Sequence, residues 1–495
     1  MSSSKNANPA GDFFTPLIEA VAELFQMLIT KGALQLPNLL KGAGSLSHGL
    51  KQNYMRIDTS MLDCERQTLD EAHLGWAINL ERPYPLQYFD PSKNTFIVGA
   101  SGWGKTNLIN ILQENCLQKK QALIYIDPKG SREAIKNFKK LCRYYGRKYY
   151  IFSEFDKEAT SFNPIADMTN SQRISMIMRS FDWGQKPNQY YLNESQKALE
   201  EVLTSLSAKK EEFDLHDVFA KLKLEHNKEE TSGLLTQLQL LLNSDFGKLF
   251  RKSLKNGKPA MTLKRAWQEK TCIYIGCSTQ GYASLAKTVG KLFVSEAMNL
   301  SYWIGKTFED SHEAQERPIG LFIDEAGSVI FPDFLDLVNK CRSSGINVYT
   351  AVQSYSDIEM IGGGDVLMKQ FFESYSNWFI QRQTHTENAE KLAASCGTFL
   401  AEKKTLATDA GSESGRGTIR TGHEYLCHPD IFKSINIGQT VLLEHGKKSL
   451  VILNVRDSRR SKAFREMTEA EKEAPIAPIE KAPMLKRKLG GAHVK

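Results

Sequence analysis

The sequence has few cysteines, and none of them has the spacing of a structural metal site. Eight cysteines are scattered over 495 residues, with no C-x-x-C pair and no histidine at zinc-binding distance. Zinc modules and small disulfide-rich secreted scaffolds need such patterns. The sequence therefore argues against both classes and predicts free thiols in a reducing compartment.

The sequence also lacks a run of apolar residues long enough to predict a transmembrane helix. The most apolar N-terminal stretch, 13–40, is interrupted by two glutamates and a lysine, whereas a membrane span needs about 20 apolar residues. Apolar residues recur at helical spacing from Phe14 to Leu28. We therefore expect segment 1–85 to contain an amphipathic helix without a transmembrane span, packed on the protein or on a neighbour rather than on a membrane. A signal peptide is not expected either.

A strong charge of one sign is missing from most of the chain. The net charge is +7, but residues 456–495 alone hold eleven Lys and Arg against six Asp and Glu, a surplus of five. Bulk charge therefore argues only weakly for polyanion binding. We expect 457–495 to be a basic, disordered tail, in which Arg459 to Lys462 and Lys486 to Lys488 either contact phosphates or partners or are simply solvated.

The most informative feature is a glycine-rich loop between an apolar strand at 95–98 and an apolar helix face at 108–112. The loop fits G-x-x-x-x-G-K-T, the Walker A pattern. The predicted nucleotide-binding residues are Gly99, Ala100, Ser101, Gly102, Trp103, Gly104, Lys105 and Thr106. The glycines let backbone N–H groups approach phosphates, the lysine adds positive charge, and the threonine hydroxyl can bind Mg²⁺.

Trp103 is unusual in this loop, where small residues are typical. Its indole can cover the nucleotide, pack on another domain or contact a neighbouring subunit, and the sequence does not distinguish among these roles.

Strands and helices alternate along the chain, which predicts an α/β fold with a parallel sheet. Segment 169–265 is rich in Leu, Lys, Glu and Gln without strand character. We expect it to be an all-helical domain inserted between the two parts of a nucleotide-binding domain, 86–168 and 266–456. The polar, glycine-rich segment 407–422 predicts a surface loop.

Further polar residues follow predicted strands. Asp324 and Glu325 end the apolar strand 320–323, the pattern of a Walker B strand, and Gln353 follows strand 346–352. Ligands bind at the carboxyl edge of open α/β sheets, so these strands aim at the site of the Walker A loop. We expect Asp324 to bind Mg²⁺, Glu325 to polarise the attacking water, and Gln353 to contact the γ-phosphate or that water.

Arg342 lies near the C-terminal end of a predicted helix, 333–343. Its permanently charged guanidinium suits an arginine finger that reaches the phosphates of a neighbouring subunit. A basic residue at a helix C-terminus can also simply stabilise the helix dipole. Both readings remain open.

These motifs occur in an order and spacing that resemble the type IV secretion coupling proteins. The resemblance covers roughly residues 90 to 455 and rests on six segments: Gly99 to Thr106, Asp127-Pro128-Lys129-Gly130, Phe162-Asn163-Pro164-Ile165, Leu321 to Glu325, Cys341 to Ile346, and Ala351 to Ser354.

The resemblance implies a RecA-like P-loop ATPase that forms a hexameric ring and delivers DNA–relaxase complexes or effector proteins to a secretion channel. ATP would bind at Lys105 and Thr106, Asp324 and Glu325 would support hydrolysis with Mg²⁺, Gln353 would act as a sensor, and Arg342 would act between subunits. The helical insert would recognise substrate.

Most family members carry two N-terminal membrane spans, which this sequence lacks. We therefore expect a cytoplasmic protein that reaches the inner face of the bacterial inner membrane through partners such as channel components. Two alternatives remain: a DNA-translocating motor of the FtsK/HerA type without a secretion role, and a nucleotide-gated platform that recruits proteins.

Overall fold

The computed structural model describes residues 69–184, 188–277, 279–308, 314–359, 364–409, 412–447 and 449–464. The predicted helix at 14–28 and the basic cluster at 486–488 lie outside these ranges. Among the described residues, no helix has the length and apolar character needed to cross a membrane. Every cysteine in the described ranges is free, as predicted, and the structure shows that each of them is also buried.

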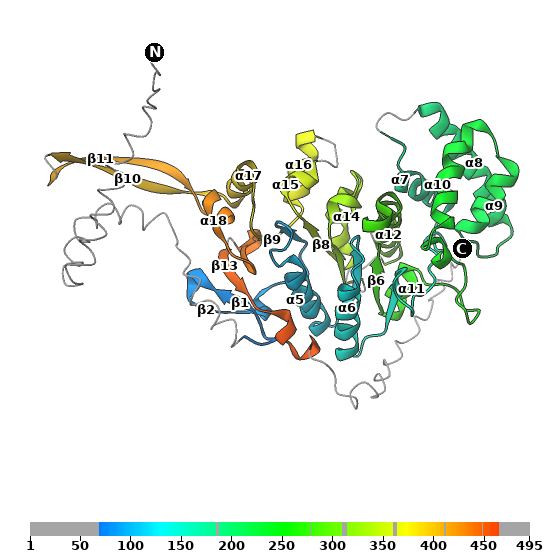
Figure 1. Cartoon of the computed structure of the whole chain (residues 1–495), viewed down its shortest axis with the longest axis horizontal. Helices are drawn as coiled ribbons and strands as arrows, with labels where there is room; N and C mark the ends of the chain where they lie inside the picture. The colour runs from blue at the N-terminus through cyan, green and yellow to red at the C-terminus, as the bar shows by residue number, and fades with distance from the viewer. Residues whose placement is uncertain are drawn as a thin grey trace, which may run out of the picture. The chain divides into compact units, whose positions relative to one another are not determined.

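A single eleven-stranded sheet forms the centre of the described chain, with the order β2-β1-β13-β12-β9-β3-β8-β7-β4-β6-β5 (Figure 1). Neighbours from β9 to β5 pair in parallel, whereas β12, β13, β1 and β2 pair antiparallel. The strands are β1 His73–Ala77, β2 Arg82–Pro85, β3 Thr95–Val98, β4 Ala122–Asp127, β5 Tyr149–Phe152, β6 Cys272–Gly276, β7 Ile319–Ile323, β8 Ile346–Val352, β9 Asn377–Ile380, β12 Gln439–Glu444 and β13 Ser449–Val455. The predicted α/β class is confirmed.

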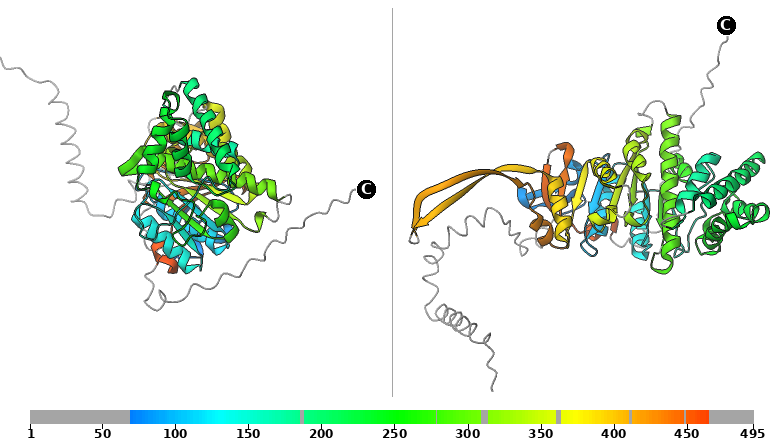
Figure 2. Two further views of the ribbon diagram at one scale, coloured as in Figure 1. Left: turned by 90° about the vertical axis from the view of Figure 1, so that its right-hand side faces the viewer. Right: turned by 90° about the horizontal axis from the view of Figure 1, so that it is seen from above.

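Helices cover both faces of the parallel strands, as the left panel of Figure 2, which views the sheet edge-on, shows. One face carries α5 (Lys105–Gln118) and α6 (Arg132–Tyr144), and the other carries α12 (Thr279–Thr307) with α14 (Phe334–Lys340) packed beside it. Further helices of the α/β part are α11 Leu263–Glu269, α15 Tyr355–Glu359, α16 Gly364–Glu373, α17 Thr386–Cys396 and α18 Pro429–Ser434. Because both faces are covered, the parallel strands are continuous apolar runs.

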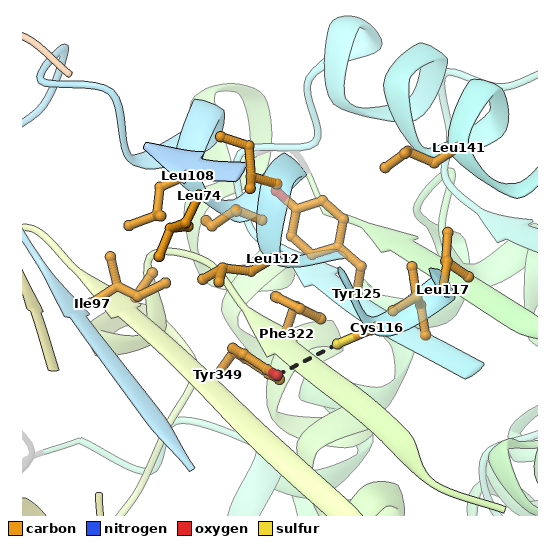
Figure 3. Packing of buried hydrophobic residues seen from close by; sticks show 14 of the residues in the cluster. Leu74, Ile97, Leu108, Leu112, Cys116, Leu117, Tyr125, Leu141, Phe322 and Tyr349 are labelled. Atoms are coloured by element: carbon orange, nitrogen blue, oxygen red, sulfur yellow. Dashed lines mark hydrogen bonds between the residues drawn. The ribbon is translucent and has the colours of Figure 1, made fainter. Parts of the chain in front are cut away.

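The core between α5 and the sheet fixes the position of the Walker A helix (Figure 3). Leu108, Leu112 and Cys116 of α5 belong to one buried cluster with Phe322 of β7 and Tyr349 of β8. The Cys116 thiol also donates a 3.4 Å hydrogen bond to the Tyr349 hydroxyl. Burying each large apolar side chain stabilises the fold by roughly 1.5–3 kcal/mol, so α5 is held firmly over the strands that carry the candidate site.

The predicted helical insert contains α7 (Asn170–Ser180), α8 (Gln189–Ala208), α9 (Leu215–Glu225) and α10 (Ser232–Asn243). Phe162, in the Phe-Asn-Pro segment, forms β-bridges with both Phe250 and Met261, on the chain that leaves the insert. The Asn163 side chain donates a 2.9 Å hydrogen bond to the carbonyl of Phe213. This segment therefore joins the entry and exit of the insert to its interior, which gives the motif a structural role.

Two expected boundaries differ from the structure. Strands β1 and β2 lie within the expected N-terminal segment 1–85, yet β1 pairs with β13 in the central sheet. Residues 458–464, expected to begin a disordered tail, form two 3-10 turns with Ala463 and Phe464 buried. Both differences arise from pairing and packing between distant parts of the chain, which a local sequence pattern does not show.

The segment expected to be a surface loop at 407–422 is instead part of a long antiparallel hairpin. Its strands are β10 (Thr398–Asp409) and β11 (Ser412–Tyr425), and within the part of the chain that the structure describes they pair only with each other. Each strand pairs with the other along one edge, outside the central sheet, so the hairpin does not need the apolar alternation of a strand that packs on a core.

Candidate active site

The Walker A loop connects the carboxyl end of β3 to the N-terminus of α5, as predicted. Gly102 and Gly104 have φ angles of 82° and 99°, a left-handed conformation that glycine adopts without steric cost. Gly104 is the N-cap of α5, and no described side chain caps the helix there. The N-terminus of this 14-residue helix is therefore available to an anion such as a phosphate.

Lys105 lies inside the curve of the loop. Its ammonium donates hydrogen bonds to the carbonyls of Gly99 at 2.5 Å and Ala100 at 3.3 Å. Burial lowers the pKa of Lys105, although the nearby carboxylates of Asp324 and Glu325 oppose this shift. The lysine is thus surrounded by acceptors and faces the Walker B carboxylates.

Gln381, which follows β9, supports the loop from behind. It is fully buried, and its side-chain amide makes no hydrogen bond within the described part of the chain. A Cβ added to Gly99 would lie 2.5 Å from the Gln381 Cβ, and one added to Gly104 would lie 3.9 Å from its Nε2. Gly99 is therefore required because Gln381 fills the space behind the loop. No sequence signal singled out Gln381.

Trp103 is held on the loop by contacts with two neighbouring segments. Its indole ring lies 4.4 Å from the guanidinium carbon of Arg382, a cation–π geometry. Its carbonyl accepts a hydrogen bond from the Gly438 N–H at 3.2 Å. Among the roles left open by the sequence, the structure shows contact with other parts of the same chain. Arg382 was not predicted, because its position depends on β9 pairing with β3.

Four residues converge at the carboxyl ends of β4, β7 and β8. Asp324 and Glu325 follow β7, Gln353 follows β8, and Lys129 follows β4. Gln353 Nε2 donates a 2.6 Å hydrogen bond to Glu325 Oε2, and Lys129 forms an ion pair with Glu325 Oε1. The sequence predicted the first three residues here but gave Lys129 no role in the site.

The two Walker B carboxyl groups have different electrostatic surroundings. Burial, with repulsion from Asp127 and Glu325, raises the pKa of Asp324 to about 7. Burial also raises the pKa of Glu325, but hydrogen bonds from Lys129 and Gln353 outweigh it and lower that pKa overall. Glu325 is therefore charged at neutral pH. The ionised form of Asp324 is disfavoured by burial and by the neighbouring negative charges, and a bound cation would stabilise it.

Asp127 organises the turn beside these residues. Its buried carboxylate accepts hydrogen bonds from the N–H groups of Lys129 at 2.9 Å and Ser131 at 3.3 Å, and from the Tyr274 hydroxyl at 2.6 Å. The Asp-Pro-Lys-Gly motif is thus a fixed turn that presents Lys129.

Arg342 lies at the opposite edge of the sheet from the loop. It belongs to the 3-10 turn Cys341–Ser344, which directly precedes β8, whereas Gln353 follows that strand. Arg342 lines a small pocket with Ser92 and Lys93, which precede β3. The arginine therefore does not join the site of its own chain, and its predicted role between subunits stays a prediction.

A pocket of about 500 Å³ opens beside the loop. Its lining includes Thr106 and Asn107 of α5, Lys129, and Asp457 to Arg459. Asn107 connects two of these walls, because its side chain donates a 2.8 Å hydrogen bond to the Arg456 carbonyl and accepts one of 2.8 Å from the Ser458 N–H. Arg456 itself forms a buried 2.5 Å ion pair with Glu114 of α5.

Two family models match the chain. Residues 83–237 match the family described as the type IV secretion-system coupling protein DNA-binding domain. Residues 318–432 match the TraM recognition site of TraD and TraG. A comparison with curated protein sequences finds no match.

Solved structures share the fold. The bacterial conjugative coupling protein TrwBdeltaN70 is 16% identical with a TM-score of 0.56, over 82% of this chain and 93% of that one. TrwB in complex with ADP and Mg²⁺ is 15% identical with a TM-score of 0.54, over 79% and 91%. VirB4 of Thermoanaerobacter pseudethanolicus is 12% identical with a TM-score of 0.52, over 81% and 97%. The predicted resemblance to coupling proteins and the predicted P-loop ATPase fold are confirmed.

Proposed function

We propose that this chain, a P-loop ATPase similar to the type IV coupling proteins, hydrolyses ATP in a ring of identical subunits and thereby delivers DNA–relaxase complexes or effector proteins to a secretion channel. The observation that carries the proposal is the convergence of Lys105, Asp324, Glu325 and Gln353 at one sheet edge, within a chain that matches two coupling-protein domains.

The residues at this edge suit each part of ATP hydrolysis. The α5 N-terminus and Lys105 bind and orient the phosphates. The negatively charged Glu325 carboxylate is held by donors from Gln353 and Lys129, so it can accept a hydrogen bond from a water and orient the water oxygen toward the γ-phosphorus. As the bond between the water oxygen and the γ-phosphorus forms, the bond from the γ-phosphorus to the β–γ bridging oxygen breaks, which yields ADP and phosphate. The proton of the water leaves to solvent.

The residues present also fit Mg²⁺. Asp324 lies at the end of β7 among the carboxylates of Asp127 and Glu325, and this crowding of negative charge favours a cation. The hydroxyl of Thr106 and the Asp324 carboxylate would hold the ion. Bound there, Mg²⁺ would neutralise charge on the β- and γ-phosphates.

The test is ATP turnover by the full chain with and without DNA, at low and at physiological salt. We expect DNA to stimulate turnover and the stimulation to weaken with salt, because contacts with the DNA backbone release counterions. Lys105→Ala should abolish turnover, whereas Glu325→Gln should lower it to a small, measurable residual rate and keep nucleotide binding. Absence of both DNA binding and stimulation at low salt would contradict the nucleic-acid part.

Delivery to a channel is tested separately. Glu325→Gln should trap partners, so affinity purification of this variant from donor cells should recover relaxase or channel proteins. Recovery of replication or division proteins instead would favour a motor without a secretion role. Tight ATP-dependent partner binding with very slow turnover would favour a recruitment platform.

A further inference from the structure

Lys129 and Glu325 are brought together by strand pairing. Strands β4 and β7 are parallel neighbours with Ile126 opposite Ile323, so the residues that follow each strand begin side by side. Lys129 is fixed at this position because its backbone N–H donates to the Asp127 carboxylate. Its ammonium then pairs with Glu325 Oε1.

The Glu325 carboxylate is held from two sides. Strand β7 lies between β4 and β8, and each neighbour contributes one donor: Lys129 to Oε1 and Gln353 to Oε2. The backbone of Glu325 is fixed as well, because it has a left-handed φ of 46° and its N–H donates to Asp324 Oδ1 at 2.9 Å. The direction of the carboxylate therefore depends on these two donors.

A purely structural role explains the ion pair poorly. The Lys129 side chain is 45% exposed and lies on the lining of the pocket that Thr106 also lines. The Glu325 side chain is only 16% exposed, but solvent at the lysine screens the pair and limits its contribution to the free energy of unfolding. The same pair, however, touches the carboxylate on which the proposed hydrolysis depends, and a displacement of that carboxylate by about 1 Å would lower turnover by up to about a hundredfold.

We propose that Lys129 is a positioning residue for ATP hydrolysis, which holds the Glu325 carboxylate at the angle required to orient the attacking water. This inference rests on the proposed function, in which Glu325 polarises that water. It gives the lysine of the Asp-Pro-Lys-Gly turn a specific task in the site.

The experiment compares Lys129→Met, which keeps the length of the side chain without its charge, with Lys129→Arg, which keeps a charged donor. The matched control is Lys148→Met, because the Lys148 side chain is 47% exposed, close to the value for Lys129. Lys148 forms an ion pair with Glu269 away from the site, and Glu269 is more exposed than Glu325. We expect Lys129→Met to lower kcat about ten- to a hundredfold with KM and thermal stability close to wild type. Lys129→Arg should recover most of the loss, and Lys148→Met should behave as wild type.

The dependence on Glu325 is tested with a double variant. If Lys129 acts through Glu325, Lys129→Met should not lower the residual kcat of Glu325→Gln any further. An unchanged or increased kcat in Lys129→Met would overturn the inference, as would a large rise in KM, which would indicate a direct phosphate contact. Absence of turnover in the wild-type protein would refute the proposed function itself, and the inference with it.

Discussion

The side-chain amide of Gln353 donates a 2.6 Å hydrogen bond to the Oε2 atom of Glu325. The bond joins the ends of two neighbouring parallel strands, β7 and β8, at the edge where the Walker A loop lies. The Gln353 N–H in turn donates to Asp357 at 2.8 Å, at the start of α15. A movement of the Glu325 carboxylate would therefore be passed through Gln353 to the start of α15, which follows β8.

Replacing Gln353 should separate catalysis from binding. A hydrogen bond to a charged group contributes roughly 1.5–3 kcal/mol, so we expect Gln353→Ala to lower kcat about tenfold or more while nucleotide affinity stays within about twofold. Steady-state kinetics and titration with a fluorescent ATP analogue measure the two effects. Gln118→Ala, at the far end of α5, is the control. A parallel loss of affinity and kcat would contradict the prediction.

The steric contact behind the loop predicts a suppressor. Gly99→Ala should abolish nucleotide binding, because its Cβ would lie 2.5 Å from the Gln381 Cβ. Gln381→Ala keeps that Cβ and should not restore binding, whereas Gln381→Gly should restore part of it. Gly102→Ala is a useful contrast, since its Cβ meets no atom within 4 Å and costs only the roughly 1–2 kcal/mol of a left-handed alanine. Equal restoration by both Gln381 variants would contradict this explanation.

Trp103 and Arg382 should be energetically coupled. We expect Trp103→Ala and Arg382→Ala each to destabilise the loop, and the double variant to lose less than the sum of the two by about 0.5–1 kcal/mol, the size of a partly exposed cation–π contact. Urea unfolding of the four proteins measures the coupling. Strict additivity would show that the ring and the guanidinium do not interact in solution.

The raised pKa of Asp324 predicts a pH dependence of stability without Mg²⁺. The folded chain keeps the Asp324 proton up to a pKa of about 7, whereas the unfolded chain loses it near the ordinary aspartate pKa of 3.8. Between these values the folded state binds more protons, so its stability should fall as the pH rises toward 7, by up to roughly 1.4 kcal/mol per pH unit. Asp324→Asn should remove this loss, stabilise the metal-free protein at pH 8 and abolish hydrolysis. Unfolding free energies of both proteins at pH 5 and pH 8, measured with a chelator, provide the check.

The ion pair between Arg456 and Glu114 should be essential for stability. Both side chains are buried, and Glu114 also accepts hydrogen bonds from Ser461 at 2.5 Å and Tyr145 at 3.1 Å. Removing one member of a buried pair typically costs about 3–5 kcal/mol, so Arg456→Met should lower the free energy of unfolding by that amount. Arg459→Met, which removes an exposed pair with Asp457, should change it by less than about 1 kcal/mol.

The sequence predicts those parts of the site that lie directly after apolar strands. The Walker A loop, Asp324, Glu325 and Gln353 follow such strands, and the carboxyl ends of parallel strands share one edge, so their convergence could be predicted without knowing the strand order. Gln381, Arg382 and the contact between Lys129 and Glu325 depend on which strands are neighbours. The pairing of β9 with β3 joins segments far apart in the chain, and no local periodicity reveals it. The same reason explains why the sequence pattern does not predict that β1, β2 and residues 458–464 belong to the α/β domain.

The paired hydrogen bonds of Asn107 act as a cross-link between the first turn of α5 and the chain that leaves β13. If an anion bound at the α5 N-terminus restrains this first turn, we expect the same two hydrogen bonds to restrain the segment that follows β13. The amide proton of Ser458 therefore reports on the Walker A loop from a distance. We expect its rate of exchange with solvent deuterium to fall when a nucleotide binds, so binding can be followed without a label on the loop itself.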